Sequence, residues 1–182
     1  YLHYLVLTYT RLNRHPNEVS RFVDAVLSRE ELTELVHRFV NGLGETDSGK
    51  SEIVGISRAI SMLKPGNVLP NVAFKNENGM LTTSDKISKR SKTIYYFWTE
   101  NYTSHFVEAN KKATLLKEKY PHYKFVAVNV DGDFSKWKAI LKDYKLDEST
   151  HVKVADFEDM RKKWAIMKIH RTIIVNADGT ID

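Results

Sequence analysis

Two apolar runs separated by one helical segment constrain the fold of this chain most. Residues 93–98 (TIYYFW) and 124–131 (KFVAVNVD) are typical of strands buried on both faces of a sheet. Residues 104–120 between them have helical character. The core candidates of this helix are Phe106, Val107, Ala113, Leu115 and Leu116. A strand–helix–strand unit implies two parallel strands joined by a right-handed crossover, so the sequence predicts an α/β fold.

Weaker signals on both sides of this unit extend the predicted sheet. Residues 71–81 indicate two short strands around a polar glycine turn, and 172–181 indicate a hairpin that turns at Asp178-Gly179. A helix is expected over 134–146 and a short helix within 160–170, whereas 84–92 is expected to be a charged loop. The predicted architecture is a three-layer α/β/α sandwich with a mixed sheet.

The first third of the chain has a different sequence pattern, which is helical throughout. Residues 1–64 predict an all-α segment, with a capping box at Ser28 and Glu31 that opens one of its helices. Pro65-Gly66 ends the last of these helices. We therefore expect an N-terminal helical module over 1–64 and an α/β domain over 65–182. A truncation at either end is compatible with the sequence, because the chain starts without Met and stops just inside the last predicted strand.

Composition excludes several function classes. The 182 residues include no cysteine, which rules out disulfides, thiolate metal sites and thiol catalysis within this chain. The net charge is +5, but the lysines are scattered among acidic residues, and a nucleic-acid site would need a denser basic cluster. No apolar run approaches the roughly 18 residues of a membrane span. A lipid anchor upstream of residue 1 is compatible with the sequence.

Four blocks of residues 66–182 resemble the thioredoxin-like fold, and specifically the TlpA/ResA-type thiol–disulfide oxidoreductases. The blocks are GNVLPNVAF with NENGMLTTSD (66–74 and 76–85), IYYFWTENYTSHF (94–106), KFVAVNVDGD (124–133) and IHRTIIVNADGTI (169–181). They keep the order and spacing of the family's opening hairpin, its active-site segment, its second central strand and its proline-containing hairpin. The resemblance implies a periplasmic or cell-envelope location in a bacterium.

The sequence departs from the family pattern at the positions of the family's catalytic residues. The nucleophilic cysteine of the family aligns with Tyr102, its resolving cysteine with His105, and the preceding tryptophan with Asn101. The cis-proline of the family aligns with His170. Thiol–disulfide exchange needs an attacking thiolate and a second thiol, which Tyr and His cannot supply. A non-proline cis bond costs about 3–4 kcal/mol, so we expect a trans peptide before His170.

The resemblance places the former active site in a cleft between two loops. Its candidate residues are Trp98, Glu100, Asn101, Tyr102, Thr103, Ser104, His105, Ile169, His170 and Arg171. We predict no catalytic residue, no cofactor and no nucleic-acid partner. The expected function is a redox-inactive binding or scaffold module for a protein or peptide, with Tyr102 as an aromatic anchor. By lineage, the alternative is a thiol–disulfide oxidoreductase, which would need a thiol from another chain.

Two further alternatives use the histidines of this cleft. His105 and His170 are candidate metal ligands, with Glu100 as a third, although a catalytic zinc normally has three protein ligands. His105 at a helix start would tend to be neutral and able to act as a base.

Other polar residues have plainer interpretations. The hydroxyls of Thr103 and Ser104 are expected to cap the helix. Asp131 and Asp133 are expected to supply turn and cap bonds rather than a cation site. The histidines interpreted as ordinary surface or turn residues are His3, His15, His122 and His151.

Overall fold

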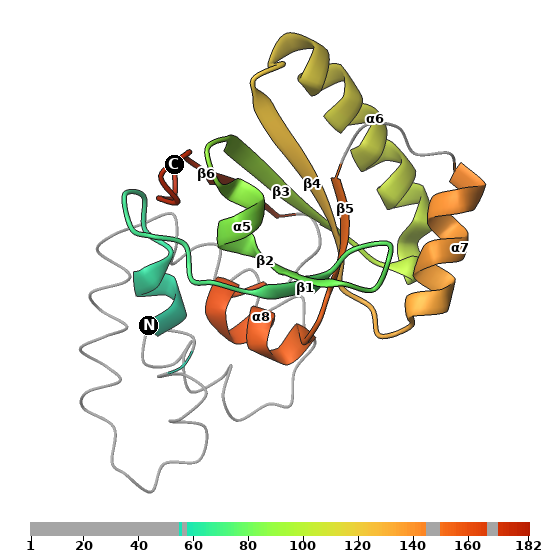
Figure 1. Ribbon diagram of the computed structural model, residues 1–182, viewed down its shortest axis with the longest axis horizontal. Coiled ribbons are helices and arrows are strands. Elements are labelled where there is room, and N and C mark those ends of the chain that lie inside the picture. Colours follow the sequence, from blue (N-terminus) through green and yellow to red (C-terminus); the bar gives the residue numbers. More distant parts are fainter. Residues whose placement is uncertain (1–54, 56–57, 145–149, 167–170) are drawn as a thin grey trace, which may run out of the picture.

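A computed structural model describes residues 55, 58–144, 150–166 and 171–182. Its strands are β1 (Ala73–Lys75), β2 (Leu81–Thr83), β3 (Lys92–Trp98), β4 (Tyr123–Asn129), β5 (Thr150–Val154) and β6 (Thr172–Val175). Its helices are α5 (Ser84–Ser88), the 3-10 turn η1 (Glu100–Tyr102), α6 (Thr103–Lys119), α7 (Phe134–Tyr144) and α8 (Phe157–Trp164). Figure 1 shows the strands as one twisted sheet with helices on both faces.

The sheet is mixed, as the sequence predicted. Its strand order is β2-β1-β5-β4-β3-β6. The central strands β3, β4 and β5 run parallel, because β3 pairs with β4 from Lys92↔Tyr123 to Trp98↔Asn129, and β4 pairs with β5 in the same sense. The outer strands are antiparallel to their neighbours, β6 against β3 and β1 against β5. The parallel pairs require crossover helices, which places α6 and α7 on the same face.

Side-chain alternation along β3 divides the core between the two faces of the sheet. Tyr95 and Phe97 point to the face covered by α5 and α8, while Tyr96 and Trp98 point to the face covered by α6 and α7. All four side chains are buried, which explains why this stretch is an apolar run without polar alternation.

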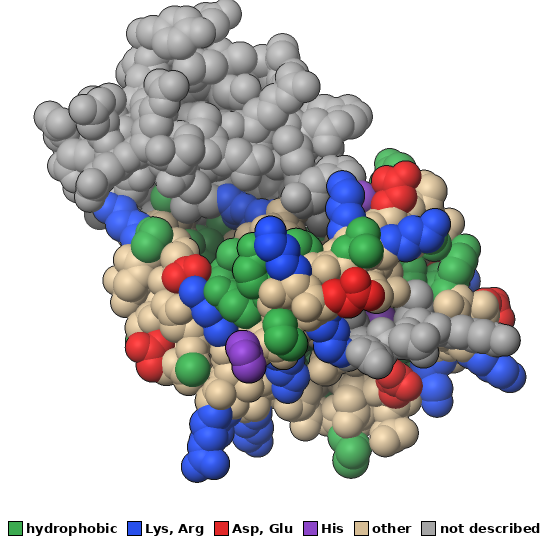
Figure 2. Space-filling model, turned by 90° about the horizontal axis from the view of Figure 1, so that it is seen from above, with side chains coloured by type: hydrophobic (Ala, Val, Ile, Leu, Met, Phe, Trp, Pro, Cys, Tyr) green, Lys and Arg blue, Asp and Glu red, His purple; other side chains and the backbone are tan. Residues whose placement is uncertain are grey.

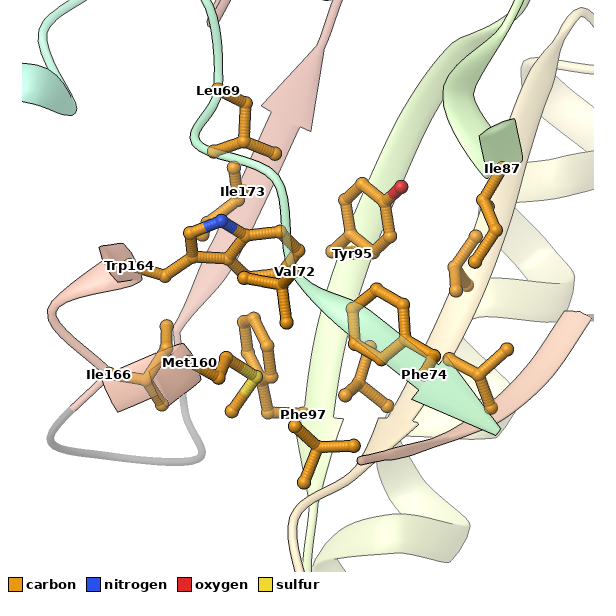
Figure 3. Close-up of a cluster of buried hydrophobic side chains, with 14 of the residues drawn as sticks. Leu69, Val72, Phe74, Ile87, Tyr95, Phe97, Met160, Trp164, Ile166 and Ile173 are labelled. Atoms are coloured by element: carbon orange, nitrogen blue, oxygen red, sulfur yellow. The ribbon is translucent and has the colours of Figure 1, made fainter. Parts of the chain in front are cut away.

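Trp164 of α8 is at the centre of the first of these two cores (Figure 3). Its ring centroid lies 5.8 Å from that of Phe74, 5.2 Å from Tyr95 and 6.1 Å from Phe97. Its indole N–H donates to the carbonyl of Pro70 at 2.6 Å, so the polar edge of this buried ring is satisfied. One side chain thus joins α8 to β1, β3 and the segment that leads into the sheet.

The structure differs from the predicted domain in three places. The strand β5 was not predicted, and 84–92 begins with the short helix α5 instead of being a loop throughout. Leu115 and Leu116 are 65% and 43% exposed, and the inward positions of α6 include Phe106, Asn110 and Ala113.

Two other expectations about the domain were confirmed. The hairpin over 172–181 has Gly179 at φ +91° and backbone bonds between Asn176 and Thr180 across the turn. The helix predicted within 160–170 is part of α8, which begins earlier, at Phe157.

The N-terminal helical module lies almost entirely outside the described residues. Residues 58–62 are helical, as expected for the end of its last helix, and Ala59 and Ile60 are buried. The division of the chain at residue 64 stays a prediction.

Replacing Trp164 by alanine is expected to lower the free energy of unfolding by about 3–5 kcal/mol, because a fully buried ring and its hydrogen bond to Pro70 are lost. Urea unfolding followed by circular dichroism measures this change. Leu115→Ala is the control, because Leu115 is exposed and its loss should change stability by no more than about 0.5 kcal/mol. Similar losses in the two variants would contradict the placement of Trp164 at the centre of the core.

Candidate functional site

The connection between β3 and α6 is the turn on which the sequence placed the candidate site. β3 ends at Trp98, Thr99 is extended with φ −133°, and η1 leads directly into α6. The hydroxyl of Thr99 accepts a hydrogen bond from the N–H of Asn101 and so caps η1. Tyr102 is the residue before α6 and provides no side-chain cap. The expectation that Thr103 and Ser104 cap this helix was therefore wrong, since both lie within its first turn.

The carboxylate of Asp131 fixes this turn by hydrogen bonds. Asp131 follows β4, and its two oxygens accept from the Thr99 hydroxyl at 2.6 Å, the Glu100 N–H at 2.6 Å and the Asn129 amide at 3.1 Å. We call this set of bonds the Asp131 clamp. It joins the end of β4 to the first residues after β3 through a charged acceptor, and hydrogen bonds to a charged acceptor are stronger than those between neutral groups. The neighbouring Asp133 caps α7 by accepting from the backbone N–H groups of Ser135 and Lys136.

A buried lysine supports the clamp. Lys153 of β5 is 3% exposed, and its ammonium donates to the Asn129 side-chain carbonyl at 3.1 Å. Burial lowers the pKa of Lys153, and the carboxylates of Asp131 and Glu100 act in the opposite direction. Burial raises the pKa of Glu100, and the charge of Asp131 adds to that effect. Charged groups of both signs are thus held together beneath the turn.

The structure separates the predicted site residues by exposure. Asn101, Tyr102 and Ser104 are exposed, and the side chain of Tyr102 is 63% exposed. Glu100, Thr103 and His105 are half-buried. Trp98 does not belong to a cleft: it is fully buried and stacks on Phe106 with ring centroids 3.8 Å apart. The correction follows from strand alternation, which turns Trp98 toward α6 and α7.

The second predicted loop is only partly described. Arg171 is half-buried, and its guanidinium donates to the carbonyl of Ala165 at 2.8 Å, which ties the end of α8 to the start of β6. Ile169 and His170 lie outside the described residues. The expected clustering of Tyr102, His105 and His170, and the expected trans peptide before His170, therefore stay predictions.

The described residues limit the chemistry of this turn. They contain no cysteine and no group of three or more His, Asp or Glu side chains placed to hold a metal ion. A metal site or a general base that uses His105 stays a prediction, because its proposed partner His170 is not described. No helix in the described part of the chain is long and apolar enough to cross a membrane. On the face shown in Figure 2, the basic side chains are dispersed among acidic and apolar ones.

His151 is a residue whose role the sequence interpretation missed. It was expected at the surface or in a turn, but it lies in β5 and is 6% exposed. Burial lowers the pKa of its imidazole to about 4. The signal that could have revealed it is the alternation of residues 150–154, in which His151 and Lys153 share one face of a strand.

Asp131→Asn is expected to lower the free energy of unfolding by about 1–3 kcal/mol, because one clamp oxygen becomes an amide donor and leaves a buried partner unsatisfied. Chemical denaturation measures the loss, and amide hydrogen exchange at Glu100 should speed up. The control is Asp143→Asn at an exposed position of α7. Unchanged exchange at Glu100 would show that Asp131 does not hold the turn.

The stability of the protein is expected to fall as pH falls from about 6.5 to about 4 because of His151. In this window the unfolded state binds a proton at its imidazole while the folded state does not, so acid favours unfolding. The effect amounts to about 3 kcal/mol. The unfolding free energies of the wild type and of His151→Phe are measured at pH 7 and at pH 4. The effect of His151 is the change in the difference between the two proteins from one pH to the other.

The carboxylates titrate in both proteins and cancel in this difference. His122→Phe is the control, because His122 is exposed and both states hydrate it. Parallel pH profiles for the wild type and His151→Phe would overturn the assignment.

A thioredoxin-like family model matches residues 91–181, which is half of the chain. A comparison of the sequence with curated proteins found no match.

Solved structures that resemble the chain include bacterial proteins provisionally described as thiol–disulfide enzymes. One from Bacteroides vulgatus is 22% identical, with a TM-score of 0.59 over 66% of this chain and 84% of its own. The C-terminal domain of one from Bacteroides thetaiotaomicron is 23% identical, with a TM-score of 0.55 over 66% and 85%. A domain of a thiol–disulfide isomerase from Cytophaga hutchinsonii is 17% identical, with a TM-score of 0.57 over 66% and 82%. Identities this low show the fold alone.

The family match, the strand order and the fold shared with these structures agree with one another. The chain therefore belongs to the thioredoxin-like family, as a member without cysteine.

Proposed function

We propose that this chain is a redox-inactive thioredoxin-like module that binds a protein or peptide partner at the β3–α6 turn. The observation that carries the proposal is Tyr102, whose side chain is 63% exposed at the start of α6, on a turn held by the Asp131 clamp. A large exposed aromatic side chain on a rigid support can bind a partner at a small cost in conformational entropy.

The surroundings of Tyr102 suit recognition of a polypeptide. Asn101 and Ser104 are exposed beside it and can exchange hydrogen bonds with a partner backbone. The first turn of α6 has no side-chain cap at Tyr102, so its N–H groups suit a carbonyl or carboxylate of the partner. Tyrosine is also among the residues most enriched at the energetic centres of protein interfaces.

The redox alternative is a thiol–disulfide oxidoreductase, as the solved structures with this fold suggest. It is less well supported, because no residue of the chain supplies a thiolate. The metal alternative uses His105, His170 and Glu100, and the described residues include no group of three or more His, Asp or Glu side chains placed to hold a metal ion. A periplasmic or cell-envelope location in a bacterium is part of the proposal and rests on the family resemblance.

Tyr102→Ala is expected to weaken partner binding by at least about tenfold, because truncation of an interface tyrosine commonly costs about 2 kcal/mol. Partners captured from an envelope extract of the native host would be identified by mass spectrometry, purified, and titrated against both proteins by calorimetry. Tyr120→Ala is the matched control, because Tyr120 is also exposed but lies at the opposite end of α6. Equal affinities for wild type and Tyr102→Ala would move the binding surface elsewhere.

An activity assay on the same protein preparation distinguishes the proposed binding module from the redox alternative. Insulin reduction by dithiothreitol should proceed at the uncatalysed rate in its presence. Turnover above that background would refute redox inactivity, whatever the binding result.

A further inference from the structure

A second candidate site lies away from the β3–α6 turn, beside α7. A cavity of about 370 Å³ is lined by Glu77, Lys138, Ala139, Leu141, Lys142 and His151. We call it the His151 cavity. Glu77 comes from the β1–β2 turn, and this turn lies close to α7, because a Cβ built on Gly79 would be 3.8 Å from the Phe134 ring. Figure 1 shows the β1–β2 turn reaching toward α7.

The imidazole of His151 is the feature of this cavity that lacks a structural explanation. It is 94% buried, yet neither ring nitrogen has a hydrogen-bond partner among the described residues. Its ring meets the edge of Phe106 at a centroid distance of 6.4 Å, so apolar packing holds it in place. Because burial keeps the imidazole neutral at pH 7, it presents one donor and one acceptor. Buried polar groups are nearly always hydrogen-bonded, so a ligand would meet an unfilled requirement here.

The charges around the cavity select an anion. Lys138 and Lys142 are exposed and lie one helical turn apart on α7. Neither takes part in the ion pairs found among the described residues. The Lys138 ammonium lies 5.9 Å from the Phe134 ring centroid, on the side of α7 that approaches the β1–β2 turn. Glu77 is the acidic residue of the lining, so two cations face one carboxylate.

The remaining walls select an organic anion over an inorganic one. Ala139 and Leu141 contribute apolar surface, and Phe106 lies behind the imidazole. An apolar cavity of about 150 Å³ is large enough for benzene, so the volume of the His151 cavity is sufficient for a small aromatic acid. A metal is not favoured, because the described residues include no group of three or more candidate ligands.

We propose that the His151 cavity binds a small organic carboxylate. The carboxylate meets the ammonium groups of α7 and accepts a hydrogen bond from His151, while the organic part packs on Leu141. This site is additional to the proposed partner surface at Tyr102 and does not depend on it.

Titration of the full chain with sodium benzoate, followed by the NMR signals of the His151 ring, tests the proposal. A saturable shift is expected with a Kd of about 1 mM, which suits a probe of this size. Benzamide has the same shape without the charge and should bind at least about tenfold more weakly. Lys142→Gln and His151→Phe should each weaken benzoate binding by about tenfold, and for His151→Phe the binding is followed by the ring signals of added benzoate.

Three controls test whether binding depends on this particular site and on an organic anion. Lys162→Gln changes an exposed lysine of α8 and Tyr102→Ala changes the partner surface, and both should leave the Kd for benzoate unchanged. Inorganic phosphate should bind more weakly than benzoate.

Three outcomes would overturn the site: no saturable shift with benzoate, equal binding of benzoate and benzamide, or an unchanged Kd in Lys142→Gln. Tighter binding of phosphate than of benzoate would overturn the carboxylate class. If His151→Phe does not fold, Lys142→Gln decides the result.

Discussion

One carboxylate determines how the central strands connect to the candidate site. Asp131 accepts hydrogen bonds from Thr99, Glu100 and Asn129, so the end of β4 is tied to the first residues after β3. Lys153 of β5 reaches the same network through Asn129. The three parallel strands therefore end in one polar cluster, and the turn before α6 is built on it. Because a buried charge is costly unless it is paired and hydrogen-bonded, this cluster strongly favours a single arrangement of the turn.

The clamp also explains how the turn can persist without sulfur. Its bonds use the backbone of Glu100 and the side chains of Thr99 and Asp131, whereas the resemblance assigns the positions of the family's cysteines to Tyr102 and His105. Tyr102 is exposed and contributes no buried contact to the core, so the fold constrains that position weakly. Phe106, one residue after His105, is fully buried against Trp98 and cannot vary as freely. Within this short segment, the residues that hold the turn are therefore different from those at the positions of the family's cysteines.

The parts of the fold that the sequence predicted are those with long periodic patterns. β3 and β4 are seven-residue apolar strands, and α6 between them has seventeen residues. β5 was not predicted because two of its five residues are His151 and Lys153. These residue types are common at protein surfaces, although both side chains are buried here. α5 escaped because it has only five residues and a polar sequence. Leu115 and Leu116 were misplaced because local hydrophobicity does not say which side of a helix meets the sheet. The candidate turn was found by its resemblance to the family. Asp131 was expected to supply turn bonds, but the sequence did not indicate that these bonds reach Thr99 and Glu100.

His151 and Lys153 show how the same strand face can hold two kinds of polar group. Both side chains are more than nine-tenths buried and lie two residues apart. Lys153 has a bond to Asn129 and carboxylates nearby, so its burial is compensated within the protein. His151 has no such bond among the described residues, and it lines a cavity with two lysines. A polar group that serves stability alone would be expected to have its partner inside the fold, as Lys153 has. The contrast between neighbours therefore points to a role for His151 that the described residues do not complete by themselves.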